Sequence, residues 1–188
     1  HALRDAISKG TYNASDLKSW HHPVEPTKLV TWVESHDTYC NAHESAGLTD
    51  EQIRAAWVFL TARNGGTPLF YSRPAGSTRE NYWGNNRVGE RGNDEFKHPV
   101  VVAVNNFRKI MQGEPEQVFT TENGDVVEIA RGTKGLVLIN FSTKEAKYKL
   151  ATNLADGEYQ DKVSGNIIKV NNGEIKGKLA PLATYIIY

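Results

Sequence analysis

The pattern of apolar residues changes near Gly113, and this change constrains the fold more than any other feature of the sequence. Beyond residue 115 the apolar residues fall into short runs, with turn sequences between them at a spacing of roughly ten residues. Asn172-Gly173 separates two of these runs and is a strong signal for a tight β-hairpin. We therefore predict an antiparallel β-sandwich over residues 114–188. Its strands are predicted at residues 126–130, 136–141, 148–150, 167–170, 175–179 and 183–188.

Residues 1–113 have a different pattern, in which helices alternate with strands. A helix over residues 2–9 precedes Gly10, a residue that suits the end of a helix. Residues 49–52 resemble a capping box, the reciprocal hydrogen bonding that starts many helices, and Pro99 suits the first position of another. Helix, strand, helix, strand is the repeat of a parallel α/β layout. The strands of this repeat are predicted at residues 29–33 and 67–71.

The first of these strands leads directly into polar residues of types that often take part in binding or catalysis. Residues 29–33 form a near-continuous apolar run, as in a parallel strand that is buried on both faces. His36 and Asp37 follow at its carboxyl end, which is where α/β barrels build their active sites. We interpret this pair as part of a functional site rather than as a cap of the strand.

Two motifs resemble one known family. The sequence WVESHD at residues 32–37 resembles the fourth signature motif of the α-amylase family, glycoside hydrolase family thirteen, in its Bacillus-type form. The sequence GTPLFYSRP at residues 66–74 resembles the eighth strand of that family's barrel. The resemblance extends from about Leu3 to the carboxyl terminus. It implies an α/β plus all-β fold, with the last part of a TIM (β/α)8 barrel over residues 1–113 and a Greek-key β-sandwich over residues 114–188.

The resemblance also implies that catalytic groups lie elsewhere. The family's nucleophilic Asp and its general acid Glu belong to earlier motifs, and neither motif occurs here. We therefore expect this chain to be the carboxyl-terminal half of a larger amylase, inactive without the amino-terminal half of the barrel. Because a sandwich can close its own core, we also expect residues 116–188 to fold without residues 1–112.

Within the family motif, Asp37 occupies the position of a third carboxylate, which stabilises the transition state. His36 matches the substrate-binding histidine. Glu34 resembles a catalytic acid, but on a strand it would point to the face opposite Asp37, so we expect it to support the site from behind. Arg73 matches a basic ligand of chloride-activated amylases, but Ser35 stands where they carry an asparagine ligand. We therefore predict no chloride dependence.

No metal site is predicted in this chain. His21, His22 and His43 form no convincing arrangement with carboxylates, so we do not favour zinc. The resemblance implies structural calcium in the full-length parent, with ligands in segments outside this chain. Cys40 is the only cysteine, which excludes an internal disulfide, and no base and orienting group suggest a catalytic thiol.

Composition excludes two classes of partner. Lys plus Arg and Asp plus Glu each total 22, so the net charge is zero, and the chain has no electrostatic signature for nucleic acid or an anionic membrane. The mean hydropathy is −0.53, and no apolar run approaches the roughly 20 residues of a membrane span. An extracellular location is implied by the family alone.

The leading functional hypothesis is a part of an endo-acting α-amylase, which hydrolyses α-1,4-glucosidic bonds in starch with retention of configuration. One alternative is a non-catalytic glucan-binding fragment, although the sandwich has tyrosines but no tryptophan. Another is a related α-glucosidase or glucan transferase. In the long loop at residues 72–97, Tyr82 and Trp83 could stack on glucose rings, but we favour the interpretation that Trp83 pins the loop to the barrel.

Overall fold

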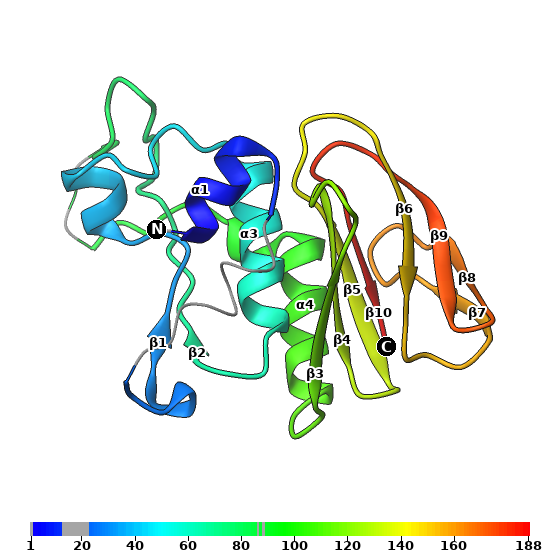
Figure 1. Cartoon of the computed structure of the whole chain (residues 1–188). Coiled ribbons are helices and arrows are strands. Elements are labelled where there is room, and N and C mark those ends of the chain that lie inside the picture. The colour runs from blue at the N-terminus through cyan, green and yellow to red at the C-terminus, as the bar shows by residue number, and fades with distance from the viewer. Residues whose placement is uncertain (1, 13–22, 86, 88) are drawn as a thin grey trace.

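The computed structural model describes residues 2–12, 23–85, 87 and 89–188 (Figure 1). Three layers lie side by side. A layer of helices covers one face of a first β-sheet, and a second sheet covers its other face. A separate pair of short strands lies beyond the helices, at the far side from the sandwich. No helix in the described ranges is long and apolar enough to cross a membrane.

Three α-helices begin and end close to the predicted positions. Helix α1 (Ala2–Lys9) is followed by Gly10, whose φ of 72° ends the helix. Helix α3 (Asp50–Ala62) starts at the predicted capping box, because Thr49 Oγ1 accepts from the Gln52 N–H at 3.3 Å while Gln52 Oε1 accepts from the Thr49 N–H at 2.9 Å. Helix α4 (Pro99–Ile110) has proline at its first position. Two short 3-10 turns, η1 (Pro26–Lys28) and η3 (Glu95–Lys97), precede the first strand and α4.

The two strands of the first part are shorter than predicted. Strands β1 (Val30–Thr31) and β2 (Thr67–Pro68) pair in parallel, with Val30 opposite Thr67. The predicted lengths were wrong because strand length depends on hydrogen-bonded neighbours, and in the described residues each of these strands pairs only with the other. Pro68 also lacks an N–H for a further ladder bond.

The first sheet of the sandwich has the strand order β10-β5-β4-β3 and is antiparallel throughout. Every residue of β4 and β5 is buried, so this sheet is covered on both faces. One face packs against the helices and the other packs against the second sheet. Its strands are β3 (Glu116–Thr120), β4 (Val126–Arg131), β5 (Gly135–Asn140) and β10 (Thr184–Ile187).

The second sheet has the order β6-β9-β8-β7, which is the Greek-key arrangement predicted from the family resemblance. Its outer face meets solvent, and β6 accordingly alternates buried and exposed residues. The predicted hairpin is confirmed: Asn172 and Gly173 have φ values of 53° and 69°, as a type I′ turn requires. The strands are β6 (Ala146–Ala151), β7 (Gly157–Gln160), β8 (Ile167–Asn171) and β9 (Glu174–Leu179).

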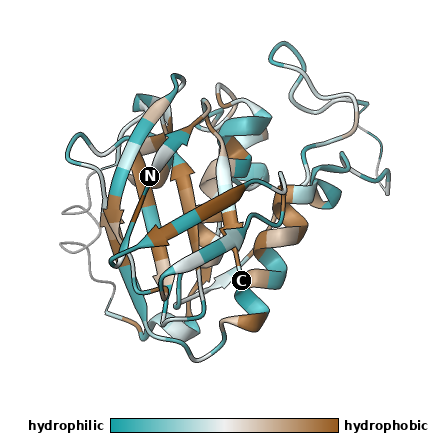
Figure 2. Cartoon of the chain, turned by 90° about the vertical axis from the view of Figure 1, so that its right-hand side faces the viewer, coloured by the Kyte–Doolittle hydropathy of each residue, from teal (hydrophilic) through white to brown (hydrophobic). Residues whose placement is uncertain are grey.

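Two hydrophobic clusters fill the space between the layers. One lies between the two sheets and includes Leu136, Leu138 and Ile175. The other joins α3 and α4 to the first sheet and includes Phe59, Phe107 and Ile139. Figure 2 shows hydrophobic residues on the strands and helices, whereas the loop that projects at the upper right is mostly hydrophilic.

The cluster between the helices and the first sheet contradicts the premise that the sandwich closes its own core, on which we expected residues 116–188 to fold independently. The sandwich does not close its own core, because the helix-facing side of its first sheet is apolar and, among the described residues, is covered by the helices and by Tyr12 after α1. Independent folding of residues 116–188 therefore has no support in this packing. The division of the chain into domains near Gly113 stays a prediction, since the cluster crosses that point without interruption.

Candidate active-site segment

The segment after β1 carries both residues predicted for the site. Asp37 begins η2 (Asp37–Asn41), a single turn of π-helix, a feature that is frequent at functional sites. The side chains of His36 and Asp37 are 68% and 69% exposed, and His36 Nε2 lies 3.4 Å from Asp37 Oδ1. Asn41 Nδ2 donates to the same Asp37 oxygen at 2.8 Å. The carboxylate is therefore open to solvent, and neighbours on both sides fix its direction.

Backbone hydrogen bonds hold this turn in place. The Tyr39 N–H donates to the Ser35 carbonyl at 2.9 Å, and the Ala42 N–H donates to the Asp37 carbonyl at 2.7 Å. The Ser35 N–H donates to Thr38 Oγ1 at 2.9 Å, and the Ser45 N–H reaches the Thr38 carbonyl at 3.0 Å. The turn is thus closed on both sides of the exposed pair.

Contacts between aromatic rings hold the turn against the long loop. Tyr39 and Cys40 are buried, and the Tyr39 ring packs edge-on against Tyr82, with centroids 5.8 Å apart. Tyr82 also contacts the ring of His43 at 4.0 Å. Trp83, which we favoured as the residue that pins the long loop, is instead 46% exposed. The structure gives the pinning role to Tyr82, and the exposed Trp83 ring is left open to solvent.

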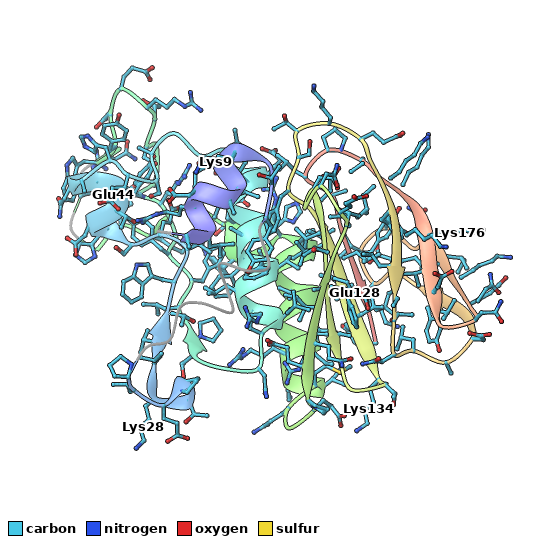
Figure 3. The ribbon with its side chains drawn as sticks, viewed as in Figure 1. Lys9, Lys28, Glu44, Glu128, Lys134 and Lys176 are labelled. Carbon is cyan, nitrogen blue, oxygen red and sulfur yellow. The ribbon has the colours of Figure 1, made fainter. Side chains whose placement is uncertain are left out.

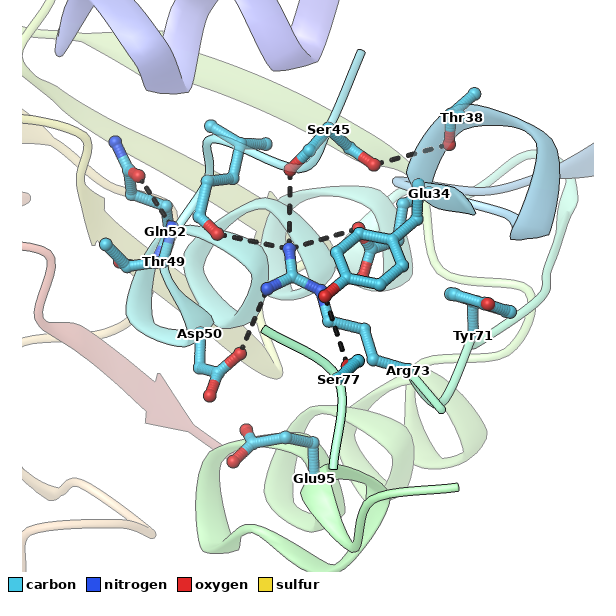
Figure 4. Close-up of polar contacts among 12 residues, drawn as sticks. Glu34, Thr38, Ser45, Thr49, Asp50, Gln52, Tyr71, Arg73, Ser77 and Glu95 are labelled. Atoms are coloured by element: carbon cyan, nitrogen blue, oxygen red, sulfur yellow. Dashed lines mark hydrogen bonds and ion pairs between the residues drawn. The ribbon is translucent and has the colours of Figure 1, made fainter. Parts of the chain in front are cut away.

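Glu34 is buried behind this turn and pairs with Arg73 (Figure 4). The guanidinium donates from Nε to Glu34 Oε1 at 2.9 Å and from Nη2 to Oε2 at 3.2 Å. Burial works to lower the pKa of Arg73, but the hydrogen bonds and charge of Glu34 reverse this effect and hold that pKa above its ordinary value. The pair spans 39 residues of sequence, and the motif alone gave no sign of it. Because β1 ends at Thr31, the strand alternation used to place Glu34 does not apply to it, and its supporting role stays a prediction.

Comparison with known proteins shows what this chain is similar to. Residues 117–188 match the family model described as "Alpha amylase, C-terminal all-beta domain". An α-amylase of Butyrivibrio fibrisolvens is 34% identical over 95% of this chain and 20% of its own length, and one of Clostridium acetobutylicum is 32% identical over 100% and 23%. The chain is similar to α-amylases over nearly its whole length. Its similarity to them confirms the resemblance drawn from residues 32–37 and 66–74.

The structural comparison agrees on the fold. The crystal structure of wild-type α-amylase I from Eisenia fetida aligns with a TM-score of 0.74 at 16% identity, over 99% of this chain and 47% of that one. The likeness includes the helical part as well as the sandwich. This chain spans about a fifth to a quarter of the length of the Butyrivibrio and Clostridium α-amylases that it matches.

The described residues of this chain contain no metal-binding cluster. No group of three or more His, Cys, Asp or Glu side chains converges there. His43 Nε2 lies 2.9 Å from the Cys40 carbonyl oxygen, while His21 and His22 lie outside the described residues. Calcium in the parent stays a prediction, and no chemical step of this chain is assigned to it.

The single thiol is enclosed. Cys40 Sγ lies 3.5 Å from the Tyr71 hydroxyl and 3.6 Å from the Tyr82 carbonyl oxygen. Burial raises the pKa of Tyr71 above its ordinary value, and the neighbouring Cys40 adds to this. A tyrosine that keeps its proton is no base for a thiol, so these surroundings give Cys40 a packing role.

One buried carboxyl in the sandwich was missed by the sequence analysis. Glu128 on β4 is 0% exposed and lies between the two sheets (Figure 3). Burial raises its pKa to about 8, against a smaller lowering by the Thr152 hydroxyl. The two-residue period of the strand could have found it, because Glu128 shares a face with Val126 and Ala130, which pack against the second sheet.

Proposed function

We propose that this chain is part of an α-amylase and supplies one side of the active site in the full-length enzyme. The observation that carries the proposal is the exposed His36–Asp37 pair at the carboxyl end of the parallel strand β1, held there by a closed turn and a buried salt bridge. In α/β barrels this end of the strands bears the catalytic groups. The activity proposed is hydrolysis of α-1,4-glucosidic bonds in starch and related glucans.

The barrel is part of the same proposal. Val30, Trp32 and Leu69 are between 49% and 58% exposed, whereas Val33 and Phe70 belong to the cluster formed with the helices. The β1–β2 pair thus has one covered side and one bare apolar side. Further parallel strands, contributed by the missing part of the parent, would cover the bare side and turn it into the interior of a barrel.

In this mechanism Asp37 acts on the sugar without forming a covalent bond. Retaining glycosidases use a nucleophile and an acid/base, and we propose that both come from the rest of the parent. The Asp37 carboxylate accepts hydrogen bonds from ring hydroxyls, and these bonds strengthen as the ring flattens toward the oxocarbenium-like transition state. His36 donates to hydroxyls of the same sugar. The chain alone would have no amylase activity.

The sandwich is not proposed as a glucan-binding module. Tyr148 is only 6% exposed and belongs to the core between the sheets, and Tyr159 and Tyr185 pack against that core. Inward-facing rings do not form a flat platform for sugars. An extracellular location of the enzyme remains part of the proposal, inferred from the family.

The test is Asp37→Asn in the full-length enzyme. Losing one preorganised transition-state contact costs about 3–4 kcal/mol, so we expect kcat on a maltooligosaccharide to fall roughly 100- to 1000-fold with a much smaller change in KM. Asp94→Asn serves as the control, because Asp94 is also an exposed aspartate but pairs with Arg91 and Lys97 instead of with residues of this turn. Unchanged turnover with a lowered melting temperature would make Asp37 a structural residue. Product analysis on starch separates hydrolysis from glucan transfer.

A further inference from the structure

One side chain contacts the candidate site segment at its beginning, middle and end. Arg73, which follows β2, is bound by Glu34 ahead of the turn. Its Nη2 also donates to the carbonyl oxygens of Ser45 at 3.4 Å and Leu48 at 3.1 Å, behind the turn. Its guanidinium carbon lies 4.5 Å from the ring centroid of Tyr39, within the turn.

All three guanidinium nitrogens take part in these contacts. Nη1, the nitrogen that reaches neither Glu34 nor the carbonyls, donates to Asp50 at 3.4 Å. The Arg73 and Glu34 side chains are only 12% and 3% exposed, so solvent screens their attraction weakly. A planar fork that bonds a carboxylate through two N–H groups fixes direction as well as distance, which a lysine ammonium cannot do.

We propose that Arg73 is a positioning residue for His36 and Asp37, and that Glu34 is its internal counter-anion. The segment from residue 34 to residue 48 carries the site, and Arg73 contacts it from outside, at both ends and in the turn. The consequence for chemistry rests on the proposed function of Asp37. A displacement of about 1 Å in a catalytic group can lower a rate by roughly 100-fold, so this anchoring bears directly on turnover.

The carboxylate of Glu34 also gives a physical reason why the turnover of the proposed enzyme should not depend on chloride or another added anion. Chloride-activated amylases, according to the resemblance, neutralise a basic residue at the position of Arg73 with a halide. Here the buried Glu34 oxygens already neutralise that guanidinium at 2.9 and 3.2 Å. A small anion would gain a place beside Arg73 only after the carboxylate is removed.

The experiment uses a charge series at residue 34 in the full-length enzyme, at constant ionic strength. Glu34→Gln removes the charge and keeps the volume, and we expect kcat to fall about 100-fold while KM changes little. Glu34→Asp keeps the charge and should retain kcat within about tenfold. Glu34→Ala opens the space, and chloride or formate should raise its kcat at least about tenfold, whereas the unmodified enzyme should not respond.

A matched control separates this role from general stability. Arg54 on α3 bonds Glu95 at 2.6 Å and Glu51 at 3.1 Å, so Glu95→Ala also removes one of two carboxylate partners of a largely buried arginine, but outside the segment that carries Asp37. This variant should lose stability without any anion-dependent change in kcat. Arg73→Lys should behave like Glu34→Gln, because one ammonium cannot replace the fork.

The outcomes separate this proposal from the proposed function. Wild-type kcat in Glu34→Gln or Arg73→Lys would overturn the positioning role, and so would a Glu34→Ala enzyme whose kcat rises with neither anion. If Asp37→Asn keeps full activity, the proposed function fails. The melting temperature of the 188-residue chain then decides the anion site, because formate should raise it in Glu34→Ala but not in the unmodified chain or Glu95→Ala.

Discussion

The strands on the two sides of the helical layer, called its two ends below, differ in how fully they are covered. The helices cover one face of each, but only the first sheet of the sandwich is also covered on its other face, by the second sheet. Where α3 and α4 meet the first sheet, every residue of β4 and β5 is buried. Where the helices meet β1 and β2, one side of the strand pair is bare, and Val30, Trp32 and Leu69 are about half exposed. The stability of the chain therefore lies mainly in the helix–sandwich core, whereas the candidate site stands at the less covered end.

This difference explains why the site depends on specific polar contacts. At the covered end, close packing alone fixes the strands, because many apolar side chains interlock. At the open end the turn that carries Asp37 is fixed by its backbone hydrogen bonds, by Tyr39 and Tyr82, and by Arg73. A change at the covered end should therefore affect stability, and a change around Arg73 should affect turnover.

The largest expected effect comes from removing the helices. Residues 114–188 alone would expose the apolar side of the first sheet, at a cost on the order of 10 kcal/mol if each of its buried side chains contributes about 1.5–3 kcal/mol. Stabilities of whole domains are of similar size. We expect no cooperative thermal transition by circular dichroism, with strong binding of a hydrophobic dye. The residues uncovered are Val127, Ile129, Val137, Ile139, Phe141 and Ile186.

The complete 188-residue chain is the reference for this measurement. A truncated sandwich that unfolds cooperatively at a similar temperature would show that the helix layer is dispensable, and the comparison between the two ends would lose its energetic basis.

The next effect compares one residue from each end. Ile139→Ala, at a position that is 0% exposed, should lower the free energy of unfolding of this chain by about 2–5 kcal/mol. Leu69→Ala, at a position that is 58% exposed, should change it by less than about 0.5 kcal/mol. Urea titration measures both. In the full-length enzyme Leu69→Ala should become costly if a completed barrel covers it, and equal costs in the short and long chains would argue against the barrel.

Glu128 tests whether the interior of the sandwich is closed. Its pKa is about 8 in the folded chain against an ordinary value of 4.5, so the folded state keeps a proton that the unfolded state releases. The contribution of protonated Glu128 to the free energy of unfolding is therefore fully present below pH 4.5 and is lost as the pH rises through about 8. Glu128→Gln should therefore gain stability over the unmodified chain as the pH rises, by on the order of 2–4 kcal/mol at pH 8.

Glu158→Gln is the control for this pH dependence, because Glu158 is exposed and pairs with Lys169 on the solvent side of the second sheet. Its stability should follow that of the unmodified chain across the same pH range. Parallel curves for Glu128→Gln as well would mean that water reaches the interior between the sheets.

The features that the sequence predicted well are those that depend on near neighbours in the chain. The capping box at Thr49 and the turn at Asn172-Gly173 need only residues within a few positions, so their patterns carry the structure. Strands β3 and β7 escaped prediction, because their residues are mostly partly or fully exposed at the sheet edges and show no run of apolar side chains.

The features that were wrong or missed depend on distant partners. The lengths of β1 and β2 follow from how many strands pair with them. The salt bridge between Glu34 and Arg73 joins two motifs that the sequence analysis treated separately. The burial of β5 on both faces had a signal, since residues 136–139 are apolar without interruption, a pattern typical of a doubly covered strand rather than an alternating one.

The smallest expected effect concerns the β8–β9 turn of the second sheet, which does not pack against the helical layer. Gly173 has a φ of 69°, and a Cβ added there would meet nothing closer than the Thr152 carbonyl oxygen at 3.9 Å. Only backbone strain therefore opposes Gly173→Ala, at about 1 kcal/mol in urea titration. Gly157→Ala is the control, because its added Cβ meets Tyr159 at an ordinary 3.7 Å and its backbone lies outside the left-handed region. It should cost less than Gly173→Ala. If Gly173→Ala instead lowered the free energy of unfolding by several kcal/mol, this hairpin would belong to the cooperative core. Tight packing would then extend further from the helices than the burial pattern indicates.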